Sequence, residues 1–140
     1  MTPKTRVLFL CTGNACRSQM AEAWARRLQA ERFEARSAGT APAGLDARAA
    51  QVMAEAGVDI SGQRSKHVDE VAGAGFDLVV TLCDDARQGC PVPPGGAPVL
   101  HAPFEDPARA RGGADEILAV FRRVRDEIRD LVAALHERLA

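Results

Sequence analysis

The fold is decided by residues 6–24, which read RVLFLCTGNACRSQMAEAW. The run from Arg6 to Leu10 is almost wholly apolar and predicts a buried strand. After Arg17 the apolar side chains recur every four residues, at Met20, Trp24 and Leu28. That spacing is typical of an amphipathic helix. A short loop with one glycine separates the two segments, so the stretch predicts a strand, a loop and a helix in that order.

Strands and helices alternate along the rest of the chain. We predict further strands at Glu34 to Ala38, Phe76 to Leu82 and Val99 to Ala102. We predict helices at Leu45 to Ala56, Val68 to Ala72 and Ala114 to Leu139. This alternation implies right-handed crossovers and the α/β fold class, with three layers: a four-stranded parallel sheet and helices on both of its faces. No repeat or linker interrupts the pattern, so we expect residues 1–140 to form a single domain.

Composition narrows the possible partners. The 18 Lys and Arg residues nearly balance the 19 Asp and Glu residues, and the net charge of −1 provides no broad basic field to attract nucleic acid or an acidic membrane. No stretch approaches the roughly 20 apolar residues of a membrane span, and the N-terminal apolar run is too short for a signal peptide. We therefore expect a cytoplasmic monomer that binds neither nucleic acid nor membranes.

The chain has four cysteines, at positions 11, 16, 83 and 90. Without a secretion signal, catalytic or metal-binding cysteines become more plausible than a structural disulfide framework. The pairs are separated by four and six residues, which does not match the usual spacing of zinc ligands. We therefore predict no metal and no cofactor.

The pattern from Cys11 to Ser18 indicates an oxyanion site. A loop formed by Thr12, Gly13, Asn14, Ala15 and Cys16 can turn its backbone N–H groups inward, and Arg17 can offer a bidentate fork to a tetrahedral anion. Phosphate, arsenate and sulfate all fit such a loop. The same field favours the thiolate form of Cys11, and Ser18 could donate a hydrogen bond to it. Cys16 has no comparable neighbour, so we interpret it as a small buried loop residue.

Two further groups follow the ends of later strands. Asp106 precedes a proline that holds the local backbone, and like-charge repulsion from a bound dianion would keep its carboxyl protonated and able to donate a proton. Glu105 is the fallback candidate. Cys83 and Cys90 would share a helix face but lie about 10 Å apart along its axis, so a disulfide between them would require the helix to unwind. The Gly- and Pro-rich sequence after Cys90 favours such unwinding.

With these residues in place, the chain resembles the thioredoxin-coupled arsenate reductases, which share their fold and anion loop with low-molecular-weight protein tyrosine phosphatases. The resemblance covers nearly the full length and is most specific in CTGNACRSQMAE, residues 11–22, and TLCD, residues 81–84. It implies that Cys11 attacks arsenate, Asp106 protonates the leaving hydroxyl, and Cys83 displaces arsenite by forming a disulfide with Cys11. Cys90 then takes over that disulfide, which thioredoxin reduces.

The resemblance also concerns a cation. Some relatives bind potassium beside the loop through an Asn, a Glu, a Ser and an Asp, of which Asn14, Glu22 and Ser37 match. Lys66 stands about where the Asp should be. We therefore expect the ammonium group of Lys66 to occupy the cation position and to make the activity indifferent to potassium.

Three other functions remain open. A tyrosine phosphatase would use Cys11, Arg17 and Asp106, but it would leave Cys83 and Cys90 idle. Its family usually has Pro at the position of Gln19 and an aromatic residue at that of Ala108. A redox sensor or oxyanion-binding module would use a Cys83–Cys90 switch without catalysis. An arsenate reductase fed by a small thiol would not need the internal relay.

Overall fold

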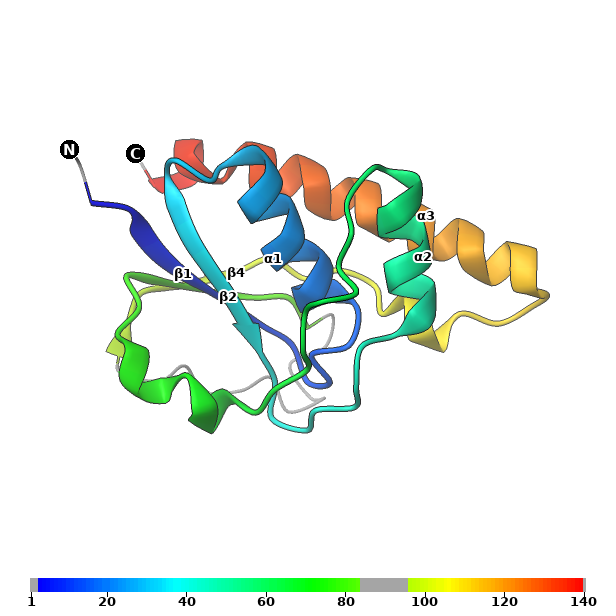
Figure 1. The fold of residues 1–140 in the computed structure, drawn as a ribbon, viewed down its shortest axis with the longest axis horizontal. Coiled ribbons are helices and arrows are strands. Elements are labelled where there is room, and N and C mark those ends of the chain that lie inside the picture. Colours follow the sequence, from blue (N-terminus) through cyan, green and yellow to red (C-terminus); the bar gives the residue numbers. More distant parts are fainter. Residues whose placement is uncertain (1–2, 84–95, 140) are drawn as a thin grey trace.

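The computed structural model describes residues 3–83 and 96–139. Its four strands are β1 (Thr5–Leu10), β2 (Phe33–Ala38), β3 (Leu78–Thr81) and β4 (Val99–His101). Its α-helices are α1 (Arg17–Leu28), α2 (Ala47–Glu55) and α3 (Ala114–Ala133). Short 3-10 helices are η1 (Val68–Glu70), η2 (Ala72–Ala74), η5 (Pro107–Arg109) and η6 (Leu135–Leu139). The elements follow the predicted alternation (Figure 1).

The four strands form one parallel sheet in the order β2-β1-β3-β4. In its register Leu10 lies beside Ala38 on one side and beside Thr81 on the other. The residues that follow these strands therefore meet at one edge of the sheet. In a parallel sheet this carboxyl edge is where ligands bind, so the predicted α/β class is confirmed together with the placement of its loops.

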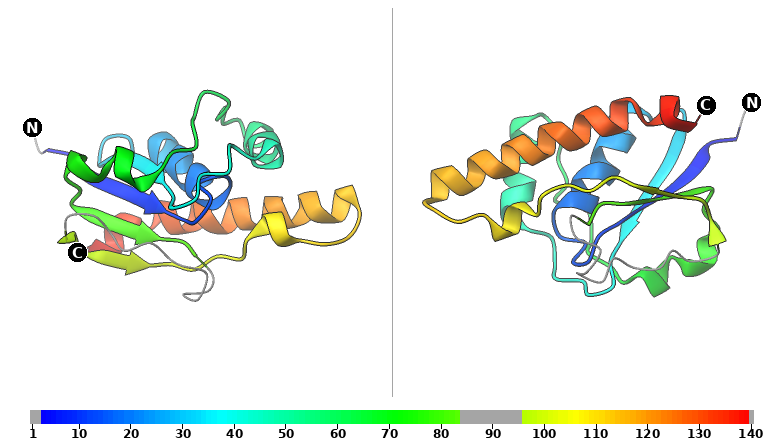
Figure 2. Two further views of the ribbon diagram at one scale, coloured as in Figure 1. Left: turned by 90° about the horizontal axis from the view of Figure 1, so that it is seen from below. Right: turned by 180° about the vertical axis from the view of Figure 1, so that it is seen from behind.

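The two faces of the sheet are covered differently. Val7 and Phe9 point into the main core, which is shared with α1, α2 and α3. Leu8 and Leu10 point to the opposite face, where Val71 and the neighbouring 3-10 turns cover them. Helices α1 and α3 lie side by side on the first face (Figure 2). The indole N–H of Trp24 on α1 donates to the carbonyl of Arg125 on α3 at 3.2 Å. Since successive strand residues alternate between faces, both sides of β1 are buried.

Several element boundaries differ from the predictions. The expected helix at Val68 to Ala72 is two 3-10 turns, and the long C-terminal helix ends at Ala133 before η6. Helix α2 begins later than expected because Asp46 caps it, accepting hydrogen bonds from the backbone N–H groups of Arg48 and Ala49. Leu28 belongs to the predicted apolar stripe but is 44% exposed, since it is the last residue of α1. Of the segment from Cys83 to Cys90, which was expected to be helical, only Cys83 lies among the described residues.

Candidate active site at the carboxyl edge of the sheet

The predicted oxyanion loop joins the end of β1 to the start of α1. Asn14 adopts a left-handed backbone conformation, with φ of 45°, at the centre of this loop. Gly39, which follows β2, packs directly against it. A Cβ atom on Gly39 would lie 2.4 Å from the carbonyl oxygen of Thr12 and 2.6 Å from that of Cys11. Because both of these atoms belong to the backbone, the loop can keep this shape only with glycine at position 39.

Cys11 is buried and lies next to Ser18, with 2.8 Å between Sγ and the hydroxyl oxygen. The hydrogen-bond network fixes which atom donates. Asn14 Oδ1 accepts from the backbone N–H of Lys66 at 2.9 Å, so Asn14 Nδ2 must be the atom that faces Ser18, at 2.7 Å. Ser18 Oγ therefore accepts from Asn14, and its own hydrogen is left to donate to Cys11. The sulfur of Cys11 thus has a hydrogen-bond donor of its own within the loop.

Arg17 and Asp106 are brought together above the loop. The guanidinium of Arg17 donates to the carbonyls of Phe104 and Leu82, at 3.1 and 3.3 Å, and lies 3.6 Å from Asp106 Oδ2. Asp106 is itself held by a hydrogen bond from the backbone N–H of Ala108. The fallback residue Glu105 instead pairs with Arg123 on α3, at 2.7 Å. Of the two predicted candidates, Asp106 is thus the carboxyl beside Arg17.

Cys83 follows β3 on the strand adjacent to β1. It is fully buried, and its Sγ lies 3.9 Å from the hydroxyl oxygen of Thr12. In the register of β1 and β3, Leu10 lies beside Thr81, so Cys83 continues opposite Thr12, the residue after Cys11. Cys11 and Cys16 are free thiols. Cys90, the remaining sequence-predicted site residue, lies outside the described residues.

Cys16 ends the loop in surroundings unlike those of Cys11. Burial raises the pKa of its thiol, and the nearby carboxylate of Asp46 raises it further by its charge and by a hydrogen bond. Cys16 is also the N-cap residue of α1, although its side chain makes no capping hydrogen bond. A thiol held in this way is a poor nucleophile, which agrees with its interpretation as a buried loop residue.

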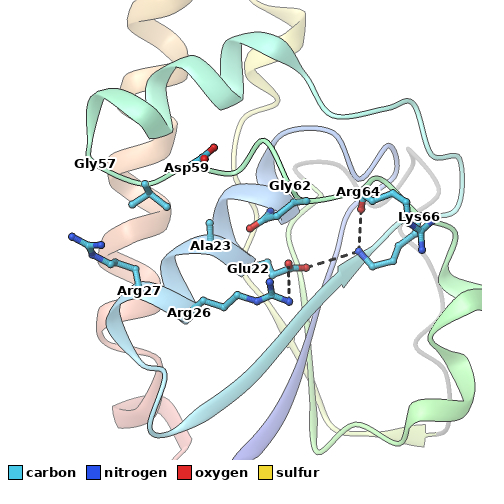
Figure 3. Close-up of a pocket in the computed structure, with 11 residues that line it drawn as sticks. Glu22, Ala23, Arg26, Arg27, Gly57, Asp59, Gly62, Arg64 and Lys66 are labelled. Carbon is cyan, nitrogen blue, oxygen red and sulfur yellow. Dashed lines mark hydrogen bonds and ion pairs between the residues drawn. The ribbon is translucent and has the colours of Figure 1, made fainter.

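Glu22 is the centre of the predicted cation site, and Figure 3 shows the ammonium of Lys66 directed toward it. This buried carboxylate accepts from the hydroxyl of Ser37 at 2.7 Å, pairs with Arg26 at 3.2 Å, and lies 4.0 Å from the ammonium of Lys66. Burial lowers the pKa of Lys66, and the charge of Glu22 partly offsets that effect. Asn14 joins this group through the backbone N–H of Lys66, not through its ammonium. Of these residues, Glu22, Arg26 and Lys66 line an open cavity of about 550 Å³.

Comparison with known proteins places this site in a family. Residues 6–140 match the family of low molecular weight phosphotyrosine protein phosphatases. The chain belongs to this family. It is 48% identical over 122 residues to an arsenate reductase of Bacillus subtilis (strain 168), covering 87% of this chain and 88% of that protein. The resemblance predicted from residues 11–22 and 81–84 is thereby confirmed.

Solved structures give the same result. An arsenate reductase in the phosphate-binding state superimposes with a TM-score of 0.81 at 32% identity, covering 97% of this chain and 99% of that one. A thioredoxin-dependent arsenate reductase from Corynebacterium glutamicum gives a TM-score of 0.68 at 30% identity, covering 98% of this chain and 64% of that one. The phosphatase-family fold is therefore shared along almost the entire chain.

Within this phosphatase-family site, sequence reasoning missed two glutamines. Gln19 was noted only as a departure from proline, and Gln63 only as part of the stretch around Lys66. In the structure Gln19 is fully buried and bonds to the anion loop, while Gln63 bonds to Gln19. The available signal was a polar side chain at a core-facing position of α1. Among the described residues no group of three or more His, Cys, Asp or Glu could hold a metal, and no helix is long and apolar enough to cross a membrane.

Proposed function

We propose that the protein reduces arsenate to arsenite through a relay of three cysteines, and that thioredoxin reduces the disulfide that remains. The observation that carries the proposal is the placement of Cys83 against Thr12 of the anion loop, at the end of the strand beside Cys11. A phosphatase needs a nucleophile, an arginine and an acid at this edge. A buried second thiol against the anion loop has a use in a redox reaction.

In the first step, the thiolate of Cys11 attacks arsenic of an arsenate held by the loop N–H groups and Arg17. Asp106 gives its proton to a hydroxyl of arsenate, which leaves as water. An S–As bond forms and an As–O bond breaks, while arsenic remains pentavalent. The hydrogen bond from Ser18 supports this step because it favours the attacking thiolate.

In the second step, Cys83 attacks the sulfur of Cys11. The electron pair of the S–As bond passes to arsenic, which becomes trivalent and leaves as arsenite, and a Cys11–Cys83 disulfide remains. The sum of both steps is arsenic acid plus two thiols giving arsenious acid, a disulfide and water. Two electrons leave the sulfurs and two arrive on arsenic. The proton of Cys83 departs with the oxygens of arsenite.

In the third step, Cys90 attacks Cys83 and restores the thiolate of Cys11. The Cys83–Cys90 disulfide is then reduced by thiol–disulfide exchange with thioredoxin. The similarity to a thioredoxin-dependent arsenate reductase supports this choice of electron donor. Arsenate is thus the substrate and thioredoxin the protein partner.

The experiment counts arsenite per chain, first without any reductant and then with thioredoxin, thioredoxin reductase and NADPH. The reduced wild type should release one arsenite per chain and turn over when thioredoxin is added. Cys90→Ser should also release about one equivalent, leaving a Cys11–Cys83 disulfide detectable by mass spectrometry, but should not turn over with thioredoxin. Cys83→Ser should release none, because its adduct cannot be resolved.

The outcomes separate the parts of the proposal. Turnover by Cys90→Ser with thioredoxin would remove Cys90 from the relay while keeping arsenate reduction. Turnover with a small thiol but not with thioredoxin would change the electron donor. Absence of arsenite from the wild type would remove the activity itself.

Hydrolysis of phosphoesters is the second candidate function. The family match and the arrangement of Cys11, Arg17 and Asp106 favour it, since these three groups suffice for a cysteinyl-phosphate mechanism. Cleavage of p-nitrophenyl phosphate by the wild type, unaffected by Cys83→Ser, together with no arsenite formation, would establish it in place of the reductase.

A further inference from the structure

We infer that Gln19 and Gln63 form a clamp that positions Asn14 and thereby sets the reactivity of Cys11, an inference that rests on the proposed use of Cys11 as the nucleophile. Neither glutamine touches the sulfur. Both are positioning residues that connect the segment around residues 63–66 to the oxyanion loop. The clamp therefore links the loop with a part of the chain about 45 positions away in sequence.

Both ends of the Gln19 side-chain amide have hydrogen-bond partners. Its Nε2 lies within hydrogen-bond distance of three acceptors, the carbonyl of Asn14 at 3.0 Å, Asn14 Oδ1 at 3.1 Å and the carbonyl of Arg64 at 3.1 Å. Two of these are backbone carbonyls, which can only accept, so the nitrogen end of Gln19 must face them. Its oxygen end then faces Gln63 Nε2, at 2.7 Å.

Gln63 fixes that orientation from outside. Its Nε2 donates to Gln19 Oε1 and also lies 3.1 Å from the backbone carbonyl of Gln19. Gln63 is half-buried, whereas Gln19 is fully buried. A rotated Gln19 amide would therefore place an oxygen against two carbonyls and a nitrogen against the donor on Gln63. Such an arrangement leaves buried polar groups unpaired, which is costly.

The clamp acts on Asn14 at the point where the donor chain to Cys11 begins. With Gln19 and the N–H of Lys66 both donating to Oδ1, the amide of Asn14 is held with Nδ2 on Ser18. Ser18 then has a single arrangement in which it accepts from Asn14 and donates to sulfur. Loss of Gln19 would leave Asn14 with one donor fewer, so Ser18 would donate to Cys11 for a smaller share of the time.

The test measures the alkylation of Cys11 by iodoacetamide between pH 5 and pH 10, using peptide mass spectrometry with fragment ions that separate Cys11 from Cys16. For Gln19→Leu we expect the half-maximal pH of Cys11 alkylation to rise by about half to one unit. The kcat/KM for arsenite formation should fall by about three- to tenfold at pH 7 and recover as the pH rises. A variant that is merely less well folded would not recover in this way.

The chain offers a matched control at the other end of the same helix. Gln29 follows the last residue of α1, is 8% exposed, and donates through Nε2 to the carbonyls of Val132 and Ala133. It lies about 15 Å from Gln19 along the helix. Gln29→Leu removes the same amide from a comparable set of carbonyls, so it should lower the melting temperature without changing the alkylation profile of Cys11.

Gln63→Leu provides a second variant at a site that water can reach. It should shift the profile in the same direction as Gln19→Leu but by less, because water can replace its hydrogen bond to Gln19. If Gln19→Leu does not fold, this variant decides the question. Profiles of the glutamine-clamp variants that coincide with the wild type, or an equal shift in Gln29→Leu, would overturn the inference. Since alkylation needs no arsenate, it also answers the question if the wild type forms no arsenite.

Discussion

The oxyanion loop begins at one buried cysteine and ends at another, and the two thiols have different neighbours. A hydrogen-bond donor lies beside Cys11, and a carboxylate lies beside Cys16. At the first end, Cys11 receives a hydrogen bond from Ser18, whose donor role is fixed by Asn14. At the second end, burial raises the pKa of Cys16, and the nearby carboxylate of Asp46 raises it further. Cys16 occupies the N-cap of α1, where the helix dipole favours a thiolate. For Cys16, burial and the nearby carboxylate therefore affect the pKa of the thiol more than the helix dipole does.

The largest expected contrast is between serine substitutions at the two ends. Cys11→Ser should lower kcat/KM for arsenite formation by at least about 10³-fold, because a hydroxyl is a far weaker nucleophile than a thiolate. Cys16→Ser should cost less than about tenfold, since a hydroxyl can keep the hydrogen bond to Asp46. The measurement is steady-state arsenite production with thioredoxin. A loss in Cys16→Ser as large as that in Cys11→Ser would break the distinction between the two ends.

A smaller effect is expected when the donor to Cys11 is removed. Ser18→Ala should reduce kcat/KM about tenfold at pH 7 and slow the alkylation of Cys11 at neutral pH, because the thiolate loses a hydrogen bond. Ser65→Ala is the matched control, since its hydroxyl donates to the carbonyl of Gly13 in the same loop but not to a sulfur. If both variants changed the pH dependence of alkylation equally, the effect would come from loop stability and not from Ser18.

Removing the negative charge beside Cys16 should make its reactivity more like that of Cys11. Asp46→Asn should make Cys16 alkylate faster near pH 9, since burial would remain but the acceptor charge would be gone. Asp59→Asn is the control, because Asp59 accepts from the backbone N–H of Ser61 in another loop. Faster alkylation of Cys16 in both variants would show an unspecific loosening.

Asp46→Asn should also change how the melting temperature of the protein depends on pH. Burial acts to raise the pKa of Asp46, but the hydrogen bonds and charge of Arg48 outweigh it, and the pKa is lowered overall. A carboxyl with a lowered pKa in the folded state stabilises the protein at pH values above the ordinary aspartate range and loses that contribution as the pH falls through the folded value. The melting temperature of Asp46→Asn should therefore lie below that of the wild type at pH 7 and approach it below about pH 4.

The sequence was sufficient to predict the fold and the site where the local residue pattern and the chemistry of the side chains indicate the same arrangement. The strand, loop and helix of residues 6–24 appear as predicted, and Cys11, Arg17, Cys83 and Asp106 are found at one edge because parallel strands end together. The pattern could not show that Leu28 would be exposed, since an apolar repeat does not reveal at which residue its own helix ends. The glutamine clamp could not be predicted from the sequence either. Its partners are about 44 positions apart, and hydrogen-bond polarity depends on geometry that no spacing encodes.

The smallest expected effect concerns potassium. The donor chain to Cys11 begins at the backbone of Lys66, whose ammonium lies 4.0 Å from Glu22 (Figure 3). With a cation already provided by the chain, replacing sodium by potassium at constant ionic strength should change kcat/KM by less than about 1.5-fold. Lys66→Asp should become responsive to potassium, because it exchanges the ammonium for an oxygen ligand beside Glu22.

Arg27→Asp is the control for this last substitution, as it makes the same change of charge in the same cavity with a side chain that points away from Glu22 (Figure 3). A strong stimulation of the wild type by potassium would mean that the ammonium of Lys66 does not take the cation's place. Equal responses of Lys66→Asp and Arg27→Asp would reduce the effect to cavity charge. A response confined to Lys66→Asp would show that the charge carried at position 66 affects the Cys11 end of the loop.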